Sequence, residues 1–339
     1  MTTEEQRCMA SGVDPRTLMH PMDARALAAL QQMPALDAAI RWVFEHGFER
    51  MLRLQNLGSA VRVGNGQFDD LHAVFVGCAE RLGVAPVPPL YLQSGGLQAY
   101  TSGVEEPFVV LHSGLVSSLT TRELEFVIGH ELGHIRCGHV LYSTLAEQLR
   151  LLLALVPGAG TLLSTATQVA LLEWHRKAEL SCDRFGLLAC EDEDAAVRVM
   201  IKLSGAPFAL YDRMSTDAFV AQYLDFERLD TDDLSAVYRV FLEAELSHPW
   251  TVERAWHVQQ WARGDTYAAL LRDLPRTGTG APDAPTRPCE ACGHALFHTD
   301  HFCVACGNAV PRTCPGCGGT LRGPARFCGS CARTVGGEA

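Results

Sequence analysis

The chain has 339 residues, of which 47% are hydrophobic and 20% are charged, and its formal net charge at pH 7 is −11. This length predicts two or three domains with enough apolar residues for a packed core. The acidic balance argues against non-specific binding to nucleic acid, and the polar first residues lack the apolar stretch of a secretory signal. We therefore expect a cytoplasmic protein.

The apolar periodicity predicts a mostly helical body with a few short strands. The expected elements are helices over 23–53 (interrupted at Pro34) and 67–83, strands near 89–93, 97–101 and 107–112, a helix capped by Thr120-Thr121, a helix ending at Cys190, and mostly helix from 192 to 272 with a break at Pro249. Thr is a favourable residue at the start of a helix. A small sheet with many helices predicts an α+β domain over residues 1–273.

Residues 130–134 read His-Glu-Leu-Gly-His within an apolar helical run. Residues four apart share a face of a helix, so His130 and His134 can point at one metal ion. Glu131 then lies where it can take a proton from water at that metal. Gly133, which has no side chain, allows a neighbouring backbone to approach closely. This motif predicts a zinc hydrolase, most often a peptidase.

A catalytic zinc site needs a third protein ligand and one open position. The continuation HExxHxxGxxH is absent, because Cys137 and Val140 occupy the positions of its Gly and its third His. On the later helix, Glu179 and Asp183 lie four residues apart on one face. This spacing predicts Glu179 as the third ligand and Asp183 as the residue that orients a ligand histidine.

Two neighbours of Glu179 leave alternatives. Arg176, one turn before Glu179, can pair with Glu179 or with Asp183. His175, four residues before Glu179, is a rival metal ligand.

Residues 151–172 carry no charge and are rich in leucine, a borderline signal for a membrane span. Pro157, Gly158 and Gly160 divide the segment into two short arms. A single span would place His134 and Glu179 on opposite sides of a bilayer, where they could not share a metal. We therefore expect two buried or surface-docked helices and at most peripheral contact with a membrane.

Four blocks in order resemble the HtpX-like and CAAX-prenyl-protease-like family of zinc metalloendopeptidases, over roughly residues 60–265. They are residues 107–115, 123–139 and 176–186, and Ser247-His248-Pro249 followed by Arg254. The resemblance implies a zincin-like domain with zinc ligands and a general base at the residues already singled out. It also implies that His248 stabilises the oxyanion. Where the family commonly has Asn-Ala on the strand that lines the substrate cleft, this chain has Gln98-Ala99.

The last part of the chain contains eight of its 13 cysteines in a repeat of 25 residues. After a Pro-, Gly- and Thr-rich linker over 274–288, the paired C-x-x-C motifs are Cys289, Cys292, Cys303 and Cys306, and then Cys314, Cys317, Cys328 and Cys331. Four thiolates at this spacing are typical of structural zinc. The rival reading is a disulfide scaffold, which regular C-x-x-C spacing without an export signal disfavours. We expect zinc ribbons at 289–306 and 314–331, each dependent on its metal for folding.

Together these patterns predict a zinc metalloendopeptidase with one catalytic and two structural zinc ions. Its substrate is a protein or peptide that pairs with the edge strand near 97–101, and its ribbons recruit substrates or protein partners. The alternative is a non-catalytic zincin-fold adaptor or chaperone-like binding protein, which would hold zinc in its ribbons alone. Nucleic-acid binding through the ribbons is the weaker rival, because the chain is acidic.

Overall fold

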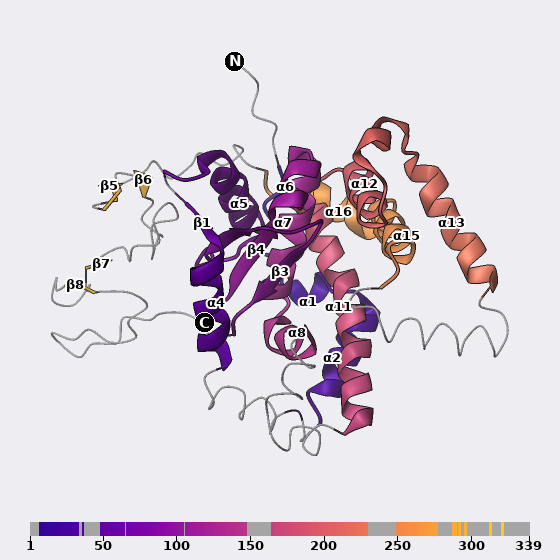
Figure 1. Cartoon of the computed structure of the whole chain (residues 1–339), viewed down its shortest axis with the longest axis horizontal. Coiled ribbons are helices and arrows are strands. Elements are labelled where there is room, and N and C mark those ends of the chain that lie inside the picture. The colour runs from indigo at the N-terminus through magenta and orange to yellow at the C-terminus, as the bar shows by residue number, and fades with distance from the viewer. Residues whose placement is uncertain are drawn as a thin grey trace.

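The computed structural model describes residues 7–33, 36, 48–64, 66–104, 106–147, 164–229 and 249–276, with short stretches between 287 and 321. Figure 1 shows a small sheet surrounded by helices. The helices are α1 (Pro15–Leu18), α2 (Pro21–Leu30), α4 (Phe48–Ser59), α5 (Asp69–Leu82), α6 (Ser113–Ser118), α7 (Thr121–Arg136), α8 (Val140–Glu147), α11 (Thr165–Cys190), α12 (Glu193–Leu203), the 3-10 helix η1 (Phe208–Arg213), α13 (Thr216–Leu229), α15 (Thr251–Ala262) and α16 (Asp265–Asp273). The prediction of a mostly helical α+β domain is confirmed.

The sheet has four strands in the order β1-β2-β4-β3, which are Val61–Val63, Leu90–Gln93, Phe108–His112 and Ala99–Ser102. β2 and β4 are parallel, whereas β1 and β3 pair antiparallel with their neighbours, so the sheet is mixed. The three predicted strands are present, and β1 is an additional one of only three residues. β3 lies at an edge of this sheet, beside α7 and α8.

Local sequence explains where α7 begins. The Thr120 hydroxyl accepts from the Glu123 backbone N–H at 3.4 Å, and the Glu123 carboxylate accepts from the Thr120 N–H at 2.7 Å. This reciprocal pair satisfies two backbone donors that a helix start leaves without partners. Lys202 of α12 lies 2.7 Å from the same buried carboxylate and ties the two helices together.

α7 and α11 pack along each other and carry the residues of the predicted metal site. Glycines make this close contact possible. A Cβ on Gly129 would lie 2.4 Å from Cβ of Ala189, and one on Gly133 would lie 3.1 Å from Cα of Cys182. The backbone approach expected at Gly133 is therefore present, and any side chain at Gly129 would force the helices apart.

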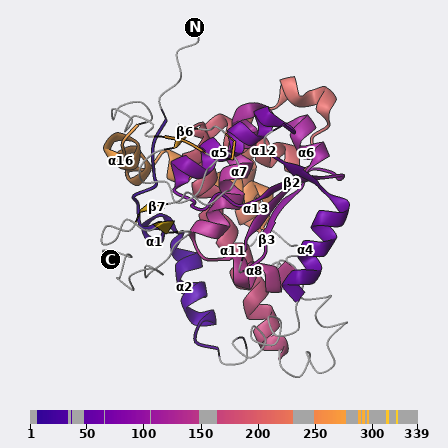
Figure 2. The ribbon, with the colours of Figure 1, turned by 90° about the vertical axis from the view of Figure 1, so that its left-hand side faces the viewer.

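The main hydrophobic core lies where the sheet, α5, α7 and α11 meet. Its fully buried side chains include Phe75, Val109, Ile128, Leu132 and Phe185. A second cluster of buried hydrophobic side chains joins α2 to α8 and α11, which lie close together in both Figure 1 and Figure 2. The N-terminal helices thus pack onto the helices that carry the sequence motifs, although they precede those motifs in the chain.

The apolar segment 151–172 differs in part from its prediction. Residues 165–172 are the first turns of α11, because Ser164 caps that helix by accepting from Thr167 N–H at 3.2 Å. Residues 151–163 lie outside the described part of the chain. None of the described helices is long and apolar enough to cross a membrane.

The cysteine tail contains two small antiparallel ladders. β5 (Arg287–Pro288) pairs with β6 (Ala295–Leu296), and β7 (Arg312–Thr313) pairs with β8 (Thr320–Leu321). The second ladder follows the first by 25 residues, so the sequence repeat recurs as a structural one. Cys289 is buried and Cys292 is exposed, while the other six predicted ligands and most of the linker lie outside the described residues.

Candidate active site

The predicted metal ligands come together in the protein interior. His130 and His134 lie one turn apart on α7, and Glu179 of α11 faces both rings. Nε2 of His130 is 3.3 Å from one oxygen of Glu179, and Nε2 of His134 is 3.3 Å from the other. The Glu179 side chain has no exposed surface. A buried carboxylate between two imidazole nitrogens is a donor set that suits zinc.

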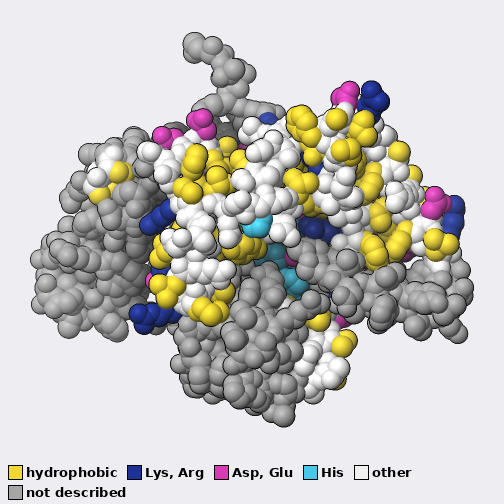
Figure 3. Space-filling model, in the orientation of Figure 1, with side chains coloured by type: hydrophobic (Ala, Val, Ile, Leu, Met, Phe, Trp, Pro, Cys, Tyr) yellow, Lys and Arg dark blue, Asp and Glu magenta, His cyan; other side chains and the backbone are white. Residues whose placement is uncertain are grey.

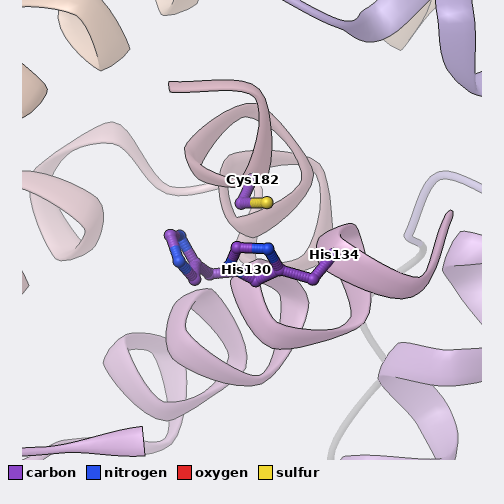
Figure 4. A group of neighbouring side chains, drawn as sticks. All are labelled: His130, His134 and Cys182. Atoms are coloured by element: carbon purple, nitrogen blue, oxygen red, sulfur yellow. The ribbon is translucent and has the colours of Figure 1, made fainter. Parts of the chain in front are cut away.

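A second side chain of α11 lies beside this group. The thiol of Cys182 and one nitrogen each of His130 and His134 lie within 4.8 Å of one another. Figure 4 shows the two imidazoles on one helix and the thiol on the helix that faces it. Cys182 is not among the predicted ligands, and only the packing of α7 on α11 places it among the histidines.

Asp183 lies behind His130, in the position that its spacing predicts. Its Oδ1 is 2.9 Å from Nδ1 of His130. If Nδ1 carries the proton and donates to Asp183, Nε2 is left with a free lone pair toward Glu179 and the metal. Arg254 of α15 donates to both oxygens of Asp183, at 2.9 Å from Nε and 2.6 Å from Nη2. Its Nη1 is also 3.4 Å from Glu179.

Arg254 is therefore an arginine of the site that pairs with both carboxylates, and the pairing of Arg176 with Glu179 or Asp183 stays a prediction. Arg176 forms an ion pair with Glu173 at 2.7 Å, on its own helix. The two residues are three positions apart, so their side chains lie on the same face of α11. Arg254 is far from α11 in sequence, and its only signal was its place in the last of the four family-like blocks.

Charge explains how the buried groups are ionised. Burial alone would lower the pKa of His130, but Glu179 and Asp183 together raise it to about 10. Burial would likewise raise the pKa of Asp183, but the charge of Arg254 and its hydrogen bonds hold it below the ordinary value. Without a metal, His130 is therefore an imidazolium, and a metal ion that binds at its free nitrogen must displace the extra proton.

Glu131 points from α7 toward the edge strand. The hydroxyl of Thr101 on β3 lies 2.7 Å from Oε2 of Glu131 and 3.0 Å from its backbone oxygen. The predicted cleft residues lie at the start of the same strand, where the Gln98 carbonyl accepts from His112 N–H at 3.0 Å and Ala99 pairs with Leu111. Thr101 lies two residues after Ala99, but no sequence signal linked it to Glu131.

His248, the predicted oxyanion donor, lies outside the described residues, which resume at Pro249 just before α15. In Figure 3 the histidine side chains visible on this face gather in a recess near the centre of the molecule, beside β3 and α11.

A second polar cluster adjoins the metal ligands and was not predicted. Asp23 of α2 accepts from Trp174 Nε1 at 3.0 Å and from the Ser181 hydroxyl at 2.5 Å, and lies 3.1 Å from Nε2 of His139. His139 follows α7, and its Nδ1 is 3.6 Å from the thiol of Cys182. The N-terminal segment thus reaches the metal site through one buried carboxylate.

Two histidines and a glutamate on paired helices, with a second glutamate beside an edge strand, define a zinc metalloprotease of the zincin class. Comparison with known families identifies the group. Residues 65–262 match the model of peptidase family M48, and residues 289–332 match that of the double zinc ribbon. The chain belongs to peptidase family M48, which confirms the resemblance drawn from its motifs.

Two curated relatives are a metallopeptidase and a protease. The chain is 34% identical over 270 residues to the plastoglobule-localized metallopeptidase 48 of Arabidopsis thaliana, covering 79% of this chain and 78% of the relative. It is 35% identical over 79 residues to a protease HtpX homolog of Streptococcus uberis, covering 22% of this chain and 27% of the relative. A crystal structure of S. mikatae Ste24p aligns with a TM-score of 0.41 at 19% identity, over 70% of this chain and 61% of that one.

Proposed function

We propose that this zinc metalloprotease is an endopeptidase in which His130, His134 and Glu179 hold the catalytic zinc and Glu131 is the general base. The observation that carries the proposal is the Glu179 carboxylate, which lies 3.3 Å from both imidazole Nε2 atoms in the buried interior. A buried carboxylate that faces two imidazole nitrogens is a donor set that suits zinc. Zinc bound at this position activates water at neutral pH and polarises a peptide carbonyl.

In this mechanism, each of the remaining site residues has one role. Glu131 accepts the proton of the attacking water and returns it to the leaving amine. Thr101 holds the Glu131 carboxylate by its hydrogen bond of 2.7 Å. Asp183 fixes the ring of His130 so that Nε2 faces the ligand position. His248 donates to the developing oxyanion, and such a donor is typically worth about 3 kcal/mol.

The substrate backbone adds to the edge strand β3 of the sheet. This edge lies beside Glu131, because Thr101 is a residue of β3 and its hydroxyl donates to the Glu131 carboxylate. An extended peptide that pairs with an edge strand gains main-chain hydrogen bonds whatever its side chains are. The arrangement supports cleavage within a polypeptide, and Gln98 and Ala99 lie where the strand enters the cleft.

The tail adds two structural zinc ions, one in each ribbon, so the whole chain holds three. We assign the ribbons to the recruitment of substrates or protein partners, while 1–273 forms the catalytic body. The adaptor alternative differs in metal content, because it would hold only the two ribbon ions. Zinc per chain, measured by mass spectrometry of the purified protein, separates three from two.

The decisive experiment compares wild type with Glu131→Gln on unfolded casein and on a cell extract analysed for new N-termini. The variant should keep its zinc content and lose turnover by about 1,000-fold, because only the proton acceptor is removed. Thr121→Ser, at the start of the same helix, is a control that should cleave normally. Equal cleavage by Glu131→Gln and wild type would refute the proposed mechanism.

A further inference from the structure

We propose that the outward side of α4 docks on the surface of an anionic lipid bilayer and holds the edge strand β3 close to that surface. The residues of this side are Arg50, Met51, Arg53, Leu54 and Leu57, which together are called the α4 outer face. The docking depends on these side chains alone, whereas its consequence for substrates rests on the proposed function.

The apolar side chains of the α4 outer face are in contact with solvent. Leu54 is 64% exposed, Leu57 is 58% exposed and Met51 is 36% exposed. Residues three or four apart lie on one side of a helix, so these side chains form a continuous strip. An apolar strip bordered by basic residues is typical of a helix that lies in a lipid interface.

The other side of α4 already packs on the sheet. Leu52 packs against the buried cluster that contains Tyr91 and Phe108, and the Tyr100 hydroxyl donates to Oδ1 of the buried Asn56 at 3.3 Å. α4 is therefore apolar on two sides, and packing on the sheet uses one of them. Figures 1 and 2 both place α4 outside the sheet, and Figure 3 shows hydrophobic and basic side chains over it.

Charge favours an anionic surface as the occupant. Residues 48–63 carry three arginines and one glutamate, a net of +2, in a chain whose net charge is −11. Arg50 and Arg53 are exposed on α4, and Arg53 pairs with the exposed Glu106. Arg62 is exposed as well, and it lies opposite Tyr91 in the register, on the sheet face that α4 covers.

The same charges disfavour a second copy of the chain as the occupant. Two copies repel each other through their net charge of −11. Anionic headgroups instead attract a local excess of arginine and accept an apolar strip between their acyl chains. The α4 outer face combines both features, so a lipid surface fits it better than an acidic protein does.

One strand separates the α4 outer face from the proposed general base. Successive residues of a strand point to opposite faces of the sheet. Tyr100 of β3 points to α4, where it bonds Asn56, and Thr101 points to Glu131. The histidine side chains visible in Figure 3 lie on the same face of the molecule as α4. A bilayer held at α4 therefore lies beside the edge strand, which favours polypeptide segments at a membrane surface as substrates.

Co-sedimentation of the full chain with vesicles tests the docking. Vesicles of phosphatidylcholine with about 30% phosphatidylserine are compared with pure phosphatidylcholine, because each arginine near an anionic surface adds about five-fold in affinity. Leu54→Gln/Leu57→Gln should weaken binding to the anionic vesicles by about 100-fold, since two apolar side chains no longer enter the interface. Arg50→Glu should weaken it by about 25-fold, since one attraction is lost and one repulsion is added.

The matched control is Leu224→Gln/Leu229→Gln on α13. These leucines are 51% and 74% exposed, but residues 216–229 carry three acidic residues and one arginine, a net of −2. This variant should bind vesicles like wild type, and equal melting temperatures check that every variant is folded. Wild-type binding by Leu54→Gln/Leu57→Gln, or an equal loss in the control, would overturn the proposal.

Analytical ultracentrifugation tests the rival occupant. A wild-type dimer that Leu54→Gln/Leu57→Gln converts to monomer, without binding of wild type to anionic vesicles, would assign the α4 outer face to a second copy of the chain. The proposal instead expects the same oligomeric state for both proteins and vesicle binding by wild type alone.

One peptide in two forms separates docking from catalysis. The peptide is either attached to the anionic vesicle by an acyl chain or free in solution. Leu54→Gln/Leu57→Gln should cleave the attached form about 10-fold more slowly than wild type and the free form equally fast, because docking raises the local concentration of enzyme. Equal rates on the attached form would refute the link to substrates. Cleavage of neither form by wild type, with vesicle binding intact, would refute the proposed function and leave the docking.

Discussion

The hydroxyl of Thr101 on the edge strand lies 2.7 Å from Oε2 of Glu131 on the metal-binding helix. This bond joins the strand proposed to bind substrate to the residue proposed to move the proton. A hydrogen bond to a charged group is typically worth about 1.5–3 kcal/mol. The position of the general base is therefore coupled to the edge of the sheet.

Thr101→Val should test this coupling, because it keeps the shape of the side chain and removes the hydroxyl. We expect kcat to fall by about 10-fold with little change in KM or zinc content, since only the orientation of Glu131 is lost. Steady-state kinetics on a defined peptide measures the split. Thr101→Ser should retain most of the activity. A rise in KM with unchanged kcat would contradict the assigned role.

Arg254→Met should destabilise the fold strongly. The change leaves the carboxylates of Asp183 and Glu179 buried without the guanidinium that contacts both. Removing one partner of a buried ion pair typically costs about 3–5 kcal/mol. Urea unfolding gives the free energy of unfolding of variant and wild type.

The matched control is Arg272→Met, which breaks an exposed pair with Asp273 at 2.9 Å. Surface pairs contribute about 0–1 kcal/mol, so this variant should unfold like wild type. Equal losses of unfolding free energy in the two variants would show that the buried ion pairs of Arg254 contribute no more to stability than the exposed pair.

Gly129→Ala should push α7 away from α11. The added Cβ would lie 2.4 Å from Cβ of Ala189 and 2.9 Å from the backbone oxygen of Phe185. Overpacking of a core typically costs about 1–3 kcal/mol, and here it opposes the usual gain from replacing a helical glycine. We expect a lower melting temperature and weaker zinc binding.

Gly77→Ala provides the control in α5, where nothing lies within 4 Å of the new Cβ. It should stabilise the protein by about 1 kcal/mol, because alanine has the higher helix propensity. Differential scanning calorimetry gives the melting temperatures of both variants and of wild type. Stabilisation by Gly129→Ala would show that the helices have room to separate.

His20 should make stability fall in mild acid. It caps α2 by accepting from Met22 N–H at 3.3 Å, and burial together with the charge of Arg184 lowers its pKa from 6.5 to about 4. The unfolded chain therefore binds more protons than the folded one between these values. Stability from this group is complete above pH 6.5 and is lost as the pH falls toward 4.

His20→Asn removes this titration and keeps a capping side chain. Melting temperatures of wild type and variant should lie close together at pH 7.5, and wild type should fall further at pH 5. All other groups titrate in both proteins, so the difference reports His20. Parallel curves over this range would rule out the assigned cause.

The sequence by itself determined the motif-bearing parts of this protein. His130, Glu131 and His134 were readable because helical periodicity alone brings residues four apart to one face. Glu179 and Asp183 were readable for the same reason, and the 25-residue cysteine repeat indicated the ribbons that the family comparison confirms. The strands near β2, β3 and β4 were readable from short apolar runs bounded by Gly and Pro.

Only the tertiary structure decided which distant side chains complete the site. Arg254, Thr101, Cys182, Asp23 and His139 come from five separate segments, and no spacing rule relates them. Their contacts depend on the approach of α7 to α11, on the edge position of β3, and on the docking of α2. Local periodicity sets the face on which a residue lies, but burial of the shared core sets which faces meet, and that is a property of the whole fold.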